Sequence, residues 1–239
     1  MNADSGASEI VSAVEALGDP ERAASSQRFF KTGPGQYGEG DRFAGVPVPK
    51  LRALARSLRG LPRSVIVDLL GDRTHEVRHL ALLILADNYS RESVDPERWV
   101  DVYRDAVRGG RVDNWDLVDV SAYAILGDRC LRSGDWSELL EWAASDDLWQ
   151  RRAGIVATFA FIRAGRWEQL EAVAPLVIDD RRDLIQKAFG WMLREAGKRA
   201  DEQTLLRYLE VNASSMGRTA LSYAVERLST ERRAHFRSL

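Results

Sequence analysis

Apolar residues recur every three or four positions along almost the whole chain, as Val77, Leu80 and Ile84 do. Stretches in which apolar and polar residues alternate are absent. This period of about 3.6 residues is typical of helices with one buried face, so the sequence predicts an all-α protein of about a dozen helices. Short breaks separate the expected helices, at Gly71-Asp72, Ser93 to Pro96, Gly109-Gly110, Ser133-Gly134, Ala164-Gly165 and Gly197.

The expected helices also repeat. Arg152 and Lys187 stand at matching places 35 residues apart, and Trp115 and Trp149 are 34 apart. Helix pairs with this period are the mark of an α-solenoid of the HEAT, armadillo or tetratricopeptide kind, in which equivalent positions line one concave surface. We therefore expect residues 1–239 to form a single domain of HEAT-like repeats with a concave groove. A globular helical bundle is the alternative.

Two local signals refine this prediction. Ser, Thr, Asp and Asn residues before the apolar runs favour helix starts, among them Thr74, Asn114 or Asp113, Ser145 or Asp146, and Asp179 or Asp180. The segment Gly33 to Pro49, GPGQYGEGDRFAGVPVP, has five glycines and three prolines in seventeen residues, which predicts a long loop. Such a loop is either functional or a solvated connection.

Composition narrows the class of protein. With 239 residues, 45% of them apolar, the chain can bury a sizeable core, which excludes a disordered tail. The longest near-apolar run, Leu80 to Ala86, is far shorter than the roughly 18 residues of a membrane span. The acidic start MNADSGASE is unlike a secretion signal. We expect a soluble, cytoplasmic protein.

Few residues are suited to cofactor chemistry. Cys130 is the one cysteine, and His75, His79 and His235 have no cysteine partners, so we expect no disulfide, no structural zinc site and no cofactor. Of 34 basic residues 30 are arginines, which bind phosphates and carboxylates through a rigid fork; a GC-rich genome would also explain the excess. The net charge of −2 gives no sign of a polyanionic partner.

Stacking of repeats predicts a site. Trp115 and Asp119 are one helical turn apart, and Arg152, then Lys187 with Trp191, occupy the matching place in the next two repeats. These side chains would converge on the concave side. Each also has a structural explanation, since tryptophans are often core residues and an Asp–Arg pair is often a structural ion pair. Asp119, however, lies among apolar neighbours, where a carboxylate is costly to bury without a partner or a polar groove.

Four segments carry a family resemblance. NWDLVD (Asn114 to Asp119), LWQRRAGI (Leu148 to Ile155) and IQKAFGWMLRE (Ile185 to Glu195) resemble motifs of the AlkD-like DNA glycosylases of the DNA alkylation repair superfamily. RFFKTGPGQYGEGDRFAGVPVPKLR (Arg28 to Arg52) looks like the N-terminal region of bacterial members. The likeness spans residues 20 to 230, in order and at compatible spacing, and IQKAFGWMLRE is its most specific part.

The resemblance implies a HEAT-like solenoid that holds double-stranded DNA and hydrolyses the N-glycosidic bond of cationic alkylated purines, such as 3-methyladenine and 7-methylguanine, without flipping the base into a pocket. By motif, Asp119 matches the catalytic aspartate of the family. Trp115 and Trp191 match the aromatic residues that contact the sugar and backbone of the damaged nucleotide. Arg152 matches an arginine that contacts DNA. Further candidate DNA-binding residues are Lys187, Arg151, Lys31 and Tyr37. We expect a monomer that needs no metal.

The chemistry of the residues agrees with this expectation. Alkylation at N3 or N7 makes the purine cationic, so it can leave as a neutral base without a general acid, and one carboxylate suffices. Trp115 and Trp191 would offer π faces to a sugar that gains positive charge. Lys187 could instead form a Schiff base, although a phosphate contact fits its setting better. Two alternatives remain: a glycosylase for bulky natural-product adducts, and a non-catalytic solenoid that binds DNA or protein.

Overall fold

The structure, a computed structural model, describes residues 6–239. It divides the chain into two compact units, Met1–Ser121 and Ala122–Leu239. Helices make up the regular structure of both units, and the described residues contain no β-strand beyond an isolated bridge between Arg42 and Thr74. The prediction of an all-α chain is confirmed.

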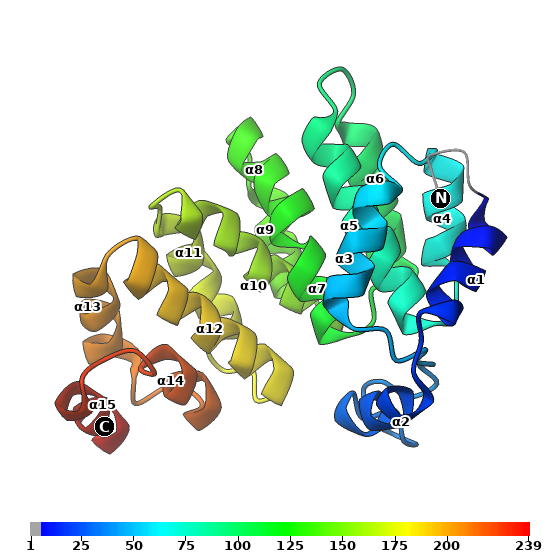
Figure 1. Cartoon of the computed structure of the whole chain (residues 1–239). Coiled ribbons are helices and arrows are strands. Elements are labelled where there is room, and N and C mark those ends of the chain that lie inside the picture. The colour runs from blue at the N-terminus through cyan, green and yellow to red at the C-terminus, as the bar shows by residue number, and fades with distance from the viewer. Residues whose placement is uncertain (1–5) are drawn as a thin grey trace. The chain divides into compact units, whose positions relative to one another are not determined.

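From residue 6 on, seven helices form the first unit (Figure 1). In chain order they are α1 (Ala7–Ala16), α2 (Pro20–Phe29), α3 (Val48–Ser57), α4 (Arg63–Leu70), α5 (His75–Arg91), α6 (Glu97–Arg108) and α7 (Trp115–Ser121). α5 is the central element, because α1, α3, α4, α6 and α7 all pack against it. It is correspondingly buried along its length, from His75 to Tyr89. A helix that is enclosed on every side serves as the core of a unit.

The expected loop runs irregularly from residue 30 to residue 47 and is tied to α5 by one carboxylate. Glu76 is 4% exposed and accepts hydrogen bonds from the backbone N–H groups of Ala44, Gly45 and Val46, at 2.8, 2.7 and 3.2 Å. Three donors in a row satisfy the charge of the buried carboxylate. The Gly- and Pro-rich segment is therefore ordered by a specific side chain of α5.

The second unit begins with a short π-helix. Its elements are η1 (Tyr123–Gly127), α8 (Asp128–Ser133), α9 (Ser137–Ala144), α10 (Leu148–Arg163), α11 (Glu168–Val177), α12 (Asp183–Arg199), α13 (Glu202–Asn212), α14 (Arg218–Ala224) and α15 (Thr230–Ser238). One row consists of η1, α10, α12 and α14, each packed against the next (Figure 1). α9, α11 and α13 pack against this row and form a second layer. This is the two-layer stacking of an α-solenoid.

Two glycines let the helices of this unit approach closely. A Cβ atom at Gly154 would lie 2.4 Å from the backbone nitrogen of Ala143 on α9. One at Gly190 would lie 2.3 Å from the carbonyl oxygen of Ala220 on α14. Both distances are far below van der Waals contact, so these positions require glycine. They lie 36 residues apart, close to the period of the repeat.

The helix boundaries depart from the sequence prediction at particular residues. α10 is capped by Asp147, whose side chain accepts from the N–H groups of Trp149 and Gln150, and not by Ser145 or Asp146. α12 starts after Arg182, later than Asp179 or Asp180 would place it. It also continues through Gly197, where a break was expected. Neighbouring polar residues offer equivalent caps, and tertiary packing decides among them.

Candidate active site

α7 carries two of the expected site residues. Trp115 opens the helix and Asp119 follows one turn later, and both are partly exposed. Leu117 and Val118 between them are fully buried. Asn114 contributes its side-chain oxygen, which accepts from the N–H of Trp115 at 2.9 Å. The first turn of α7 is thus anchored by its apolar residues, while Trp115 and Asp119 share a more accessible side of the helix.

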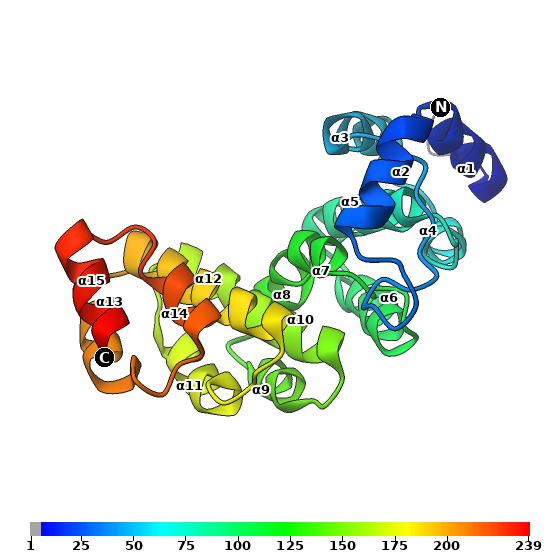
Figure 2. The same ribbon diagram turned by 90° about the horizontal axis from the view of Figure 1, so that it is seen from below.

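The indole of Trp115 is held by the end of α2. The ring of Phe30 stacks on it with a centroid distance of 5.2 Å and an interplanar angle of 12°. Phe29 meets the same indole edge-on at 5.9 Å and is itself 65% exposed. An exposed phenylalanine beside a partly exposed tryptophan gives this end of the unit an aromatic surface. The approach of α2 to α5 and α7 is visible in Figure 2.

Lys31 and Tyr37 lie together in the same region of the chain. The ammonium of Lys31 lies 5.9 Å from the centre of the Tyr37 ring, and the carbonyl of Lys31 accepts from the N–H of Gly38 at 3.2 Å. Lys31 has a φ of 53°, a left-handed conformation that is uncommon for a residue with a side chain. It directly follows Phe29 and Phe30, so a cation accompanies the aromatic surface.

Behind Trp115 lies a buried cluster of charged groups. His75, at the start of α5, is hydrogen-bonded through Nδ1 to Asp41 at 2.7 Å and through Nε2 to Asp116 at 2.8 Å. Arg78 donates to Asp41 at 2.9 Å and to Asp113 at 3.0 Å. Asp41 comes from the loop and Asp116 from α7. The cluster therefore joins three separate segments through charge-assisted hydrogen bonds.

These contacts change the ionisation of the groups. Burial disfavours the charged ring, but the hydrogen bonds to Asp116 and Asp41 outweigh it and raise the pKa of His75 to about 9. Burial also opposes the charge of the carboxylates, but their basic partners have the larger effect. Contacts with His75 and His79 lower the pKa of Asp116, and contacts with His75 and Arg78 lower the pKa of Asp41. At neutral pH the cluster consists of ion pairs.

His75, His79 and Asp116 also form a group of metal-ligand types, with one atom each within 4.8 Å of the others. Their spacing suits hydrogen bonding better. Nε2 of His75 lies 2.8 Å from Oδ2 of Asp116, whereas two ligands about 2.0 to 2.1 Å from a tetrahedral zinc are roughly 3.3 Å apart. We therefore treat the group as an ion-pair cluster. The geometry favours a proton, not a metal ion, between the imidazole and the carboxylate.

In the second unit, Trp191 belongs to a row of aromatic residues. Its ring centre is 6.0 Å from that of Phe159 on α10, which lies 5.3 Å from that of Tyr123 on η1. The guanidinium groups of Arg199 and Arg163 lie over Phe159 and Tyr123, at 5.3 and 5.9 Å. Successive helices of the inner row thus each contribute one ring, and arginines flank them.

The basic residues of this unit differ in accessibility. Arg152 is 4% exposed and its guanidinium donates to the carbonyl of Leu184. Arg151 donates to the carbonyls of Ser145, Leu176 and Ala144 and pairs with Asp180 at 3.2 Å. Lys187 has a side chain that is 39% exposed and pairs with Asp183 at 2.8 Å. The contacts of Arg151 tie the start of α10 to α9 and α11, and the expected contact of Arg151 with DNA stays a prediction.

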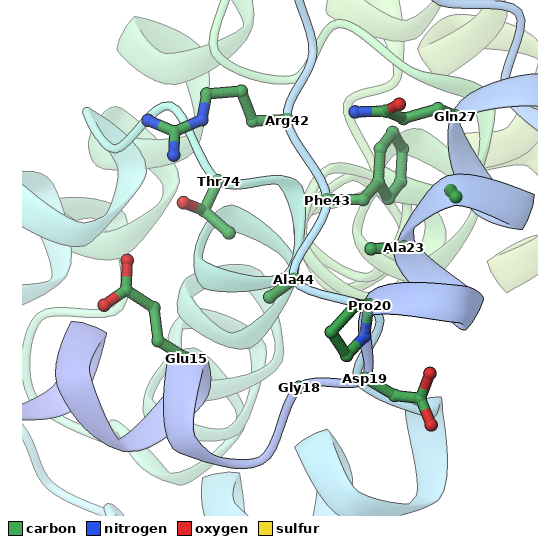
Figure 3. Close-up of a pocket in the computed structure, with 11 residues that line it drawn as sticks. Glu15, Gly18, Asp19, Pro20, Ala23, Gln27, Arg42, Phe43, Ala44 and Thr74 are labelled. Atoms are coloured by element: carbon green, nitrogen blue, oxygen red, sulfur yellow. The ribbon is translucent and has the colours of Figure 1, made fainter.

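The first unit also contains an open cavity of about 520 Å³, lined by residues of α1, α2 and the loop (Figure 3). Arg42 and Thr74 lie on one side of it and Gln27 and Phe43 on another, with Glu15 below. None of the site residues expected from the sequence lines it. The cavity and the α7 site are therefore distinct features of the same unit.

Comparison with known proteins decides the family. The chain matches the family described as DNA alkylation repair enzyme over residues 10–228. The chain belongs to this family. It is similar to a solved structure titled as a predicted DNA alkylation repair enzyme from Enterococcus faecalis, with 20% sequence identity and a TM-score of 0.71, over 90% of this chain and 98% of that one. No curated protein matches it.

Membership of the DNA alkylation repair enzyme family supports a role in DNA repair. No helix among residues 6–239 is long and apolar enough to cross a membrane. The structure brings Trp115 and Asp119 together in one unit, and Arg152, Lys187 and Trp191 occur in the other. Their convergence on one groove stays a prediction.

Sequence reasoning missed Phe29, Phe30 and the His75 cluster. The i,i+4 pair His75 and His79, together with the acidic Asp116 beside Trp115, was the available signal for the cluster. In the sequence, the histidines without cysteine partners argue only against a structural zinc site.

Proposed function

We propose that the protein is a monofunctional DNA glycosylase that hydrolyses the N-glycosidic bond of cationic alkylated purines in duplex DNA. The observation that carries the proposal is the pair on α7: Asp119 one turn after Trp115, both partly exposed, in a chain of the DNA alkylation repair enzyme family. A protein that only binds phosphates gains nothing from a carboxylate on its binding surface, because the charges repel.

The chemistry needs one carboxylate. The bond between C1′ and the purine nitrogen breaks, and its electron pair neutralises the positive charge of the alkylated base. The sugar becomes an oxocarbenium-like cation, which the carboxylate of Asp119 stabilises electrostatically. Water then adds its oxygen to C1′ and releases a proton to Asp119 or to solvent. No general acid is needed for a leaving group that departs neutral, unlike in ordinary glycoside hydrolysis.

The aromatic residues support this step. Trp115 and Trp191 would contact the sugar and backbone of the lesion nucleotide, where a cation near a π face gains about 0.5 to 2 kcal/mol. Lys187, Lys31 with Tyr37, and Arg152 would hold the phosphates. The base is released without capture in a tight pocket, and no metal or cofactor takes part.

Release of 7-methylguanine from methylated duplex DNA, measured by chromatography, tests the activity. Asp119→Asn keeps the side-chain shape and removes the charge, so release should fall by about 100-fold or more. Binding of the duplex should be unchanged or slightly tighter. Asp101→Asn is the matched control, because Asp101 is exposed on α6 and pairs with Arg104 one turn along the same helix. Normal release by Asp119→Asn would refute the proposal.

Substrate charge gives a second, independent readout. Duplexes that contain uracil or hypoxanthine present neutral lesions, whose bases leave slowly unless an acid protonates them. We expect release of 3-methyladenine and 7-methylguanine but not of these bases. Efficient release of uracil would mean that another mechanism operates.

A further inference from the structure

We propose that His75, as an imidazolium between Asp41 and Asp116, is a positioning residue that sets the first turn of α7 and thereby places Trp115 and Asp119 for base release. The inference rests on the proposed function and extends it to a residue behind the site. It arises from the cluster geometry, in which one buried ring connects the loop, α5 and α7.

Both nitrogens of the His75 ring are engaged. Each faces a carboxylate oxygen, at 2.7 Å from Asp41 and 2.8 Å from Asp116. A neutral imidazole has one donor and one acceptor nitrogen, so it would direct a lone pair at one of the carboxylates. Only the doubly protonated ring donates to both. The side chains of His75 and Asp41 are each 3% exposed, so water does not replace either bond.

Other charged and polar groups surround the ring and its two carboxylates. On α5 itself, Arg78 is bonded to Asp41, and His79 has its Nδ1 3.4 Å from Asp116. Asn114 donates to Asp41 at 3.3 Å. The next residue of α5, Glu76, is engaged by loop amides. The rings of Phe43 and Phe30 pack on the imidazole, at 4.5 and 5.0 Å.

Counting these groups shows why the proton matters. Asp41, Asp113 and Asp116 are countered by Arg78 and by His75 when it is charged. If His75 were neutral, Asp116, whose side chain is 15% exposed, would lose its nearer cation and keep the Nδ1 of His79 at 3.4 Å. A buried charge that loses its partner moves or takes up a proton.

The His75 cluster is connected to Trp115 and Asp119 in two ways. Asp116 is the residue after Trp115 and lies three positions before Asp119 on the same helix. Phe30 provides a second connection, since it contacts His75 on one side and stacks on Trp115 on another. Displacement of Asp116 or Phe30 therefore shifts both proposed catalytic residues. A misplacement of about 1 Å can cost on the order of 100-fold in rate.

The test uses the full-length chain and its release of 7-methylguanine from methylated duplex. His75→Gln keeps polarity but cannot carry the charge. We expect kcat to fall about tenfold or more with little change in KM. Wild-type kcat should fall as the pH rises through about 9, the pKa of His75, and the variant should lack that fall. Spontaneous release is subtracted at each pH. His235→Gln, at an exposed histidine, is the matched control.

A double variant separates positioning from loss of folding. In His75→Gln/Asp116→Asn, two amides can hydrogen-bond without an unpaired charge, so kcat should recover relative to His75→Gln alone. Thermal unfolding of each variant shows whether it is folded at the assay temperature. Folded His75→Gln with wild-type kcat and an unchanged pH profile would overturn the proposal, while wild-type release would still support the proposed function.

Two measurements on the wild-type protein test the proposal even if a variant does not fold. ¹⁵N NMR of the imidazole should show both nitrogens of His75 protonated at pH 7. Metal analysis of the purified protein should find no stoichiometric ion. A neutral ring, or an ion bound by His75, His79 and Asp116, overturns the proposal. Absence of base release by the wild-type protein would instead remove the proposed function itself.

Discussion

Single buried charges organise the first unit, and Glu76 is the clearest example because its partners are all backbone groups. A carboxylate that accepts three N–H bonds fixes the conformation of the residues that donate them. The loop that contains Asp41 is held in this way just after it leaves the His75 cluster. Two adjacent residues of α5, His75 and Glu76, thus bind the same loop at two points.

Glu76→Gln should therefore destabilise the protein. The amide removes the negative charge and turns one acceptor into a donor that faces backbone N–H groups, which leaves buried donors unsatisfied at a cost of about 2 to 4 kcal/mol. Chemical denaturation monitored by circular dichroism measures this change. Glu97→Gln is the matched control, since the Glu97 side chain is 46% exposed and pairs with Arg104. Equal stability of the two variants would contradict the role assigned to Glu76.

Lys187 is the site cation with the most accessible side chain in its unit, so it is expected to contact a phosphate. Lys187→Ala should weaken duplex binding and reduce the slope of log K against log salt by about 0.9, the effect of one phosphate contact. Arg104→Ala, on α6 in the first unit, should leave the slope unchanged. Titration of labelled duplex at several salt concentrations measures both, and equal changes would exclude the phosphate contact.

Sequence reasoning reached the residues of α7 but not their environment. Trp115 and Asp119 were found because their spacing is local, one turn of one helix. His75 meets Asp41 and Asp116 across 34 and 41 positions of sequence, and no local pattern encodes such a meeting. Phe29 and Phe30 were unremarkable in the sequence for the same reason, since their contact with Trp115 depends on the path of the loop.

At the scale of elements, the repeat that was predicted from residue spacing corresponds to real packing. The inner helices α10, α12 and α14 lie side by side, and the glycines of α10 and α12 sit where a neighbouring helix comes closest. The π-helix η1 had no sequence signal, because a single widened turn within a run of helices leaves no distinctive pattern of residues. Gly197 was misjudged as a break because glycine in a helix can also serve close packing, here against Leu205.

Gly190→Ala tests the packing of α12 against α14. Its new methyl group would collide with a backbone carbonyl, which cannot rotate away as a side chain can. Overpacking of this kind costs about 1 to 3 kcal/mol or more, which exceeds the gain of about 1 kcal/mol in helix propensity. We expect a lower melting temperature. Gly6→Ala, with no atom within 4 Å of the new methyl group, should change it much less. A melting temperature that rises in Gly190→Ala would show that the helices can separate at no cost.

At the scale of the whole molecule, positive and negative charges are nearly equal in number, and many of them form ion pairs. The net charge is −2, with 34 basic and 36 acidic residues. Ion pairs in both units lower carboxylate pKa values, as for Asp41 and Asp116 in the first and Asp180 and Glu195 in the second. Stability contributed by such carboxylates is present at neutral pH and is lost as the pH falls below about 4, where they take up protons.

His75 makes the opposite contribution, and it gives the alkaline side of the stability profile. Its pKa rises from 6.5 in the unfolded chain to about 9 in the folded protein. Below pH 6.5 both states hold the proton and the stabilisation is complete; between 6.5 and 9 only the folded state holds it, so the free energy of unfolding declines as the pH rises. The full difference corresponds to roughly 3 kcal/mol.

Urea denaturation at intervals from pH 6 to pH 9 should show this decline. Cys130, whose pKa burial raises to about 11, and Tyr208, whose pKa burial raises to about 12, should affect stability only near and above the upper end of this range. His75→Gln should flatten the profile between pH 6.5 and 9, and a decline of equal size in that variant would mean that another group causes it.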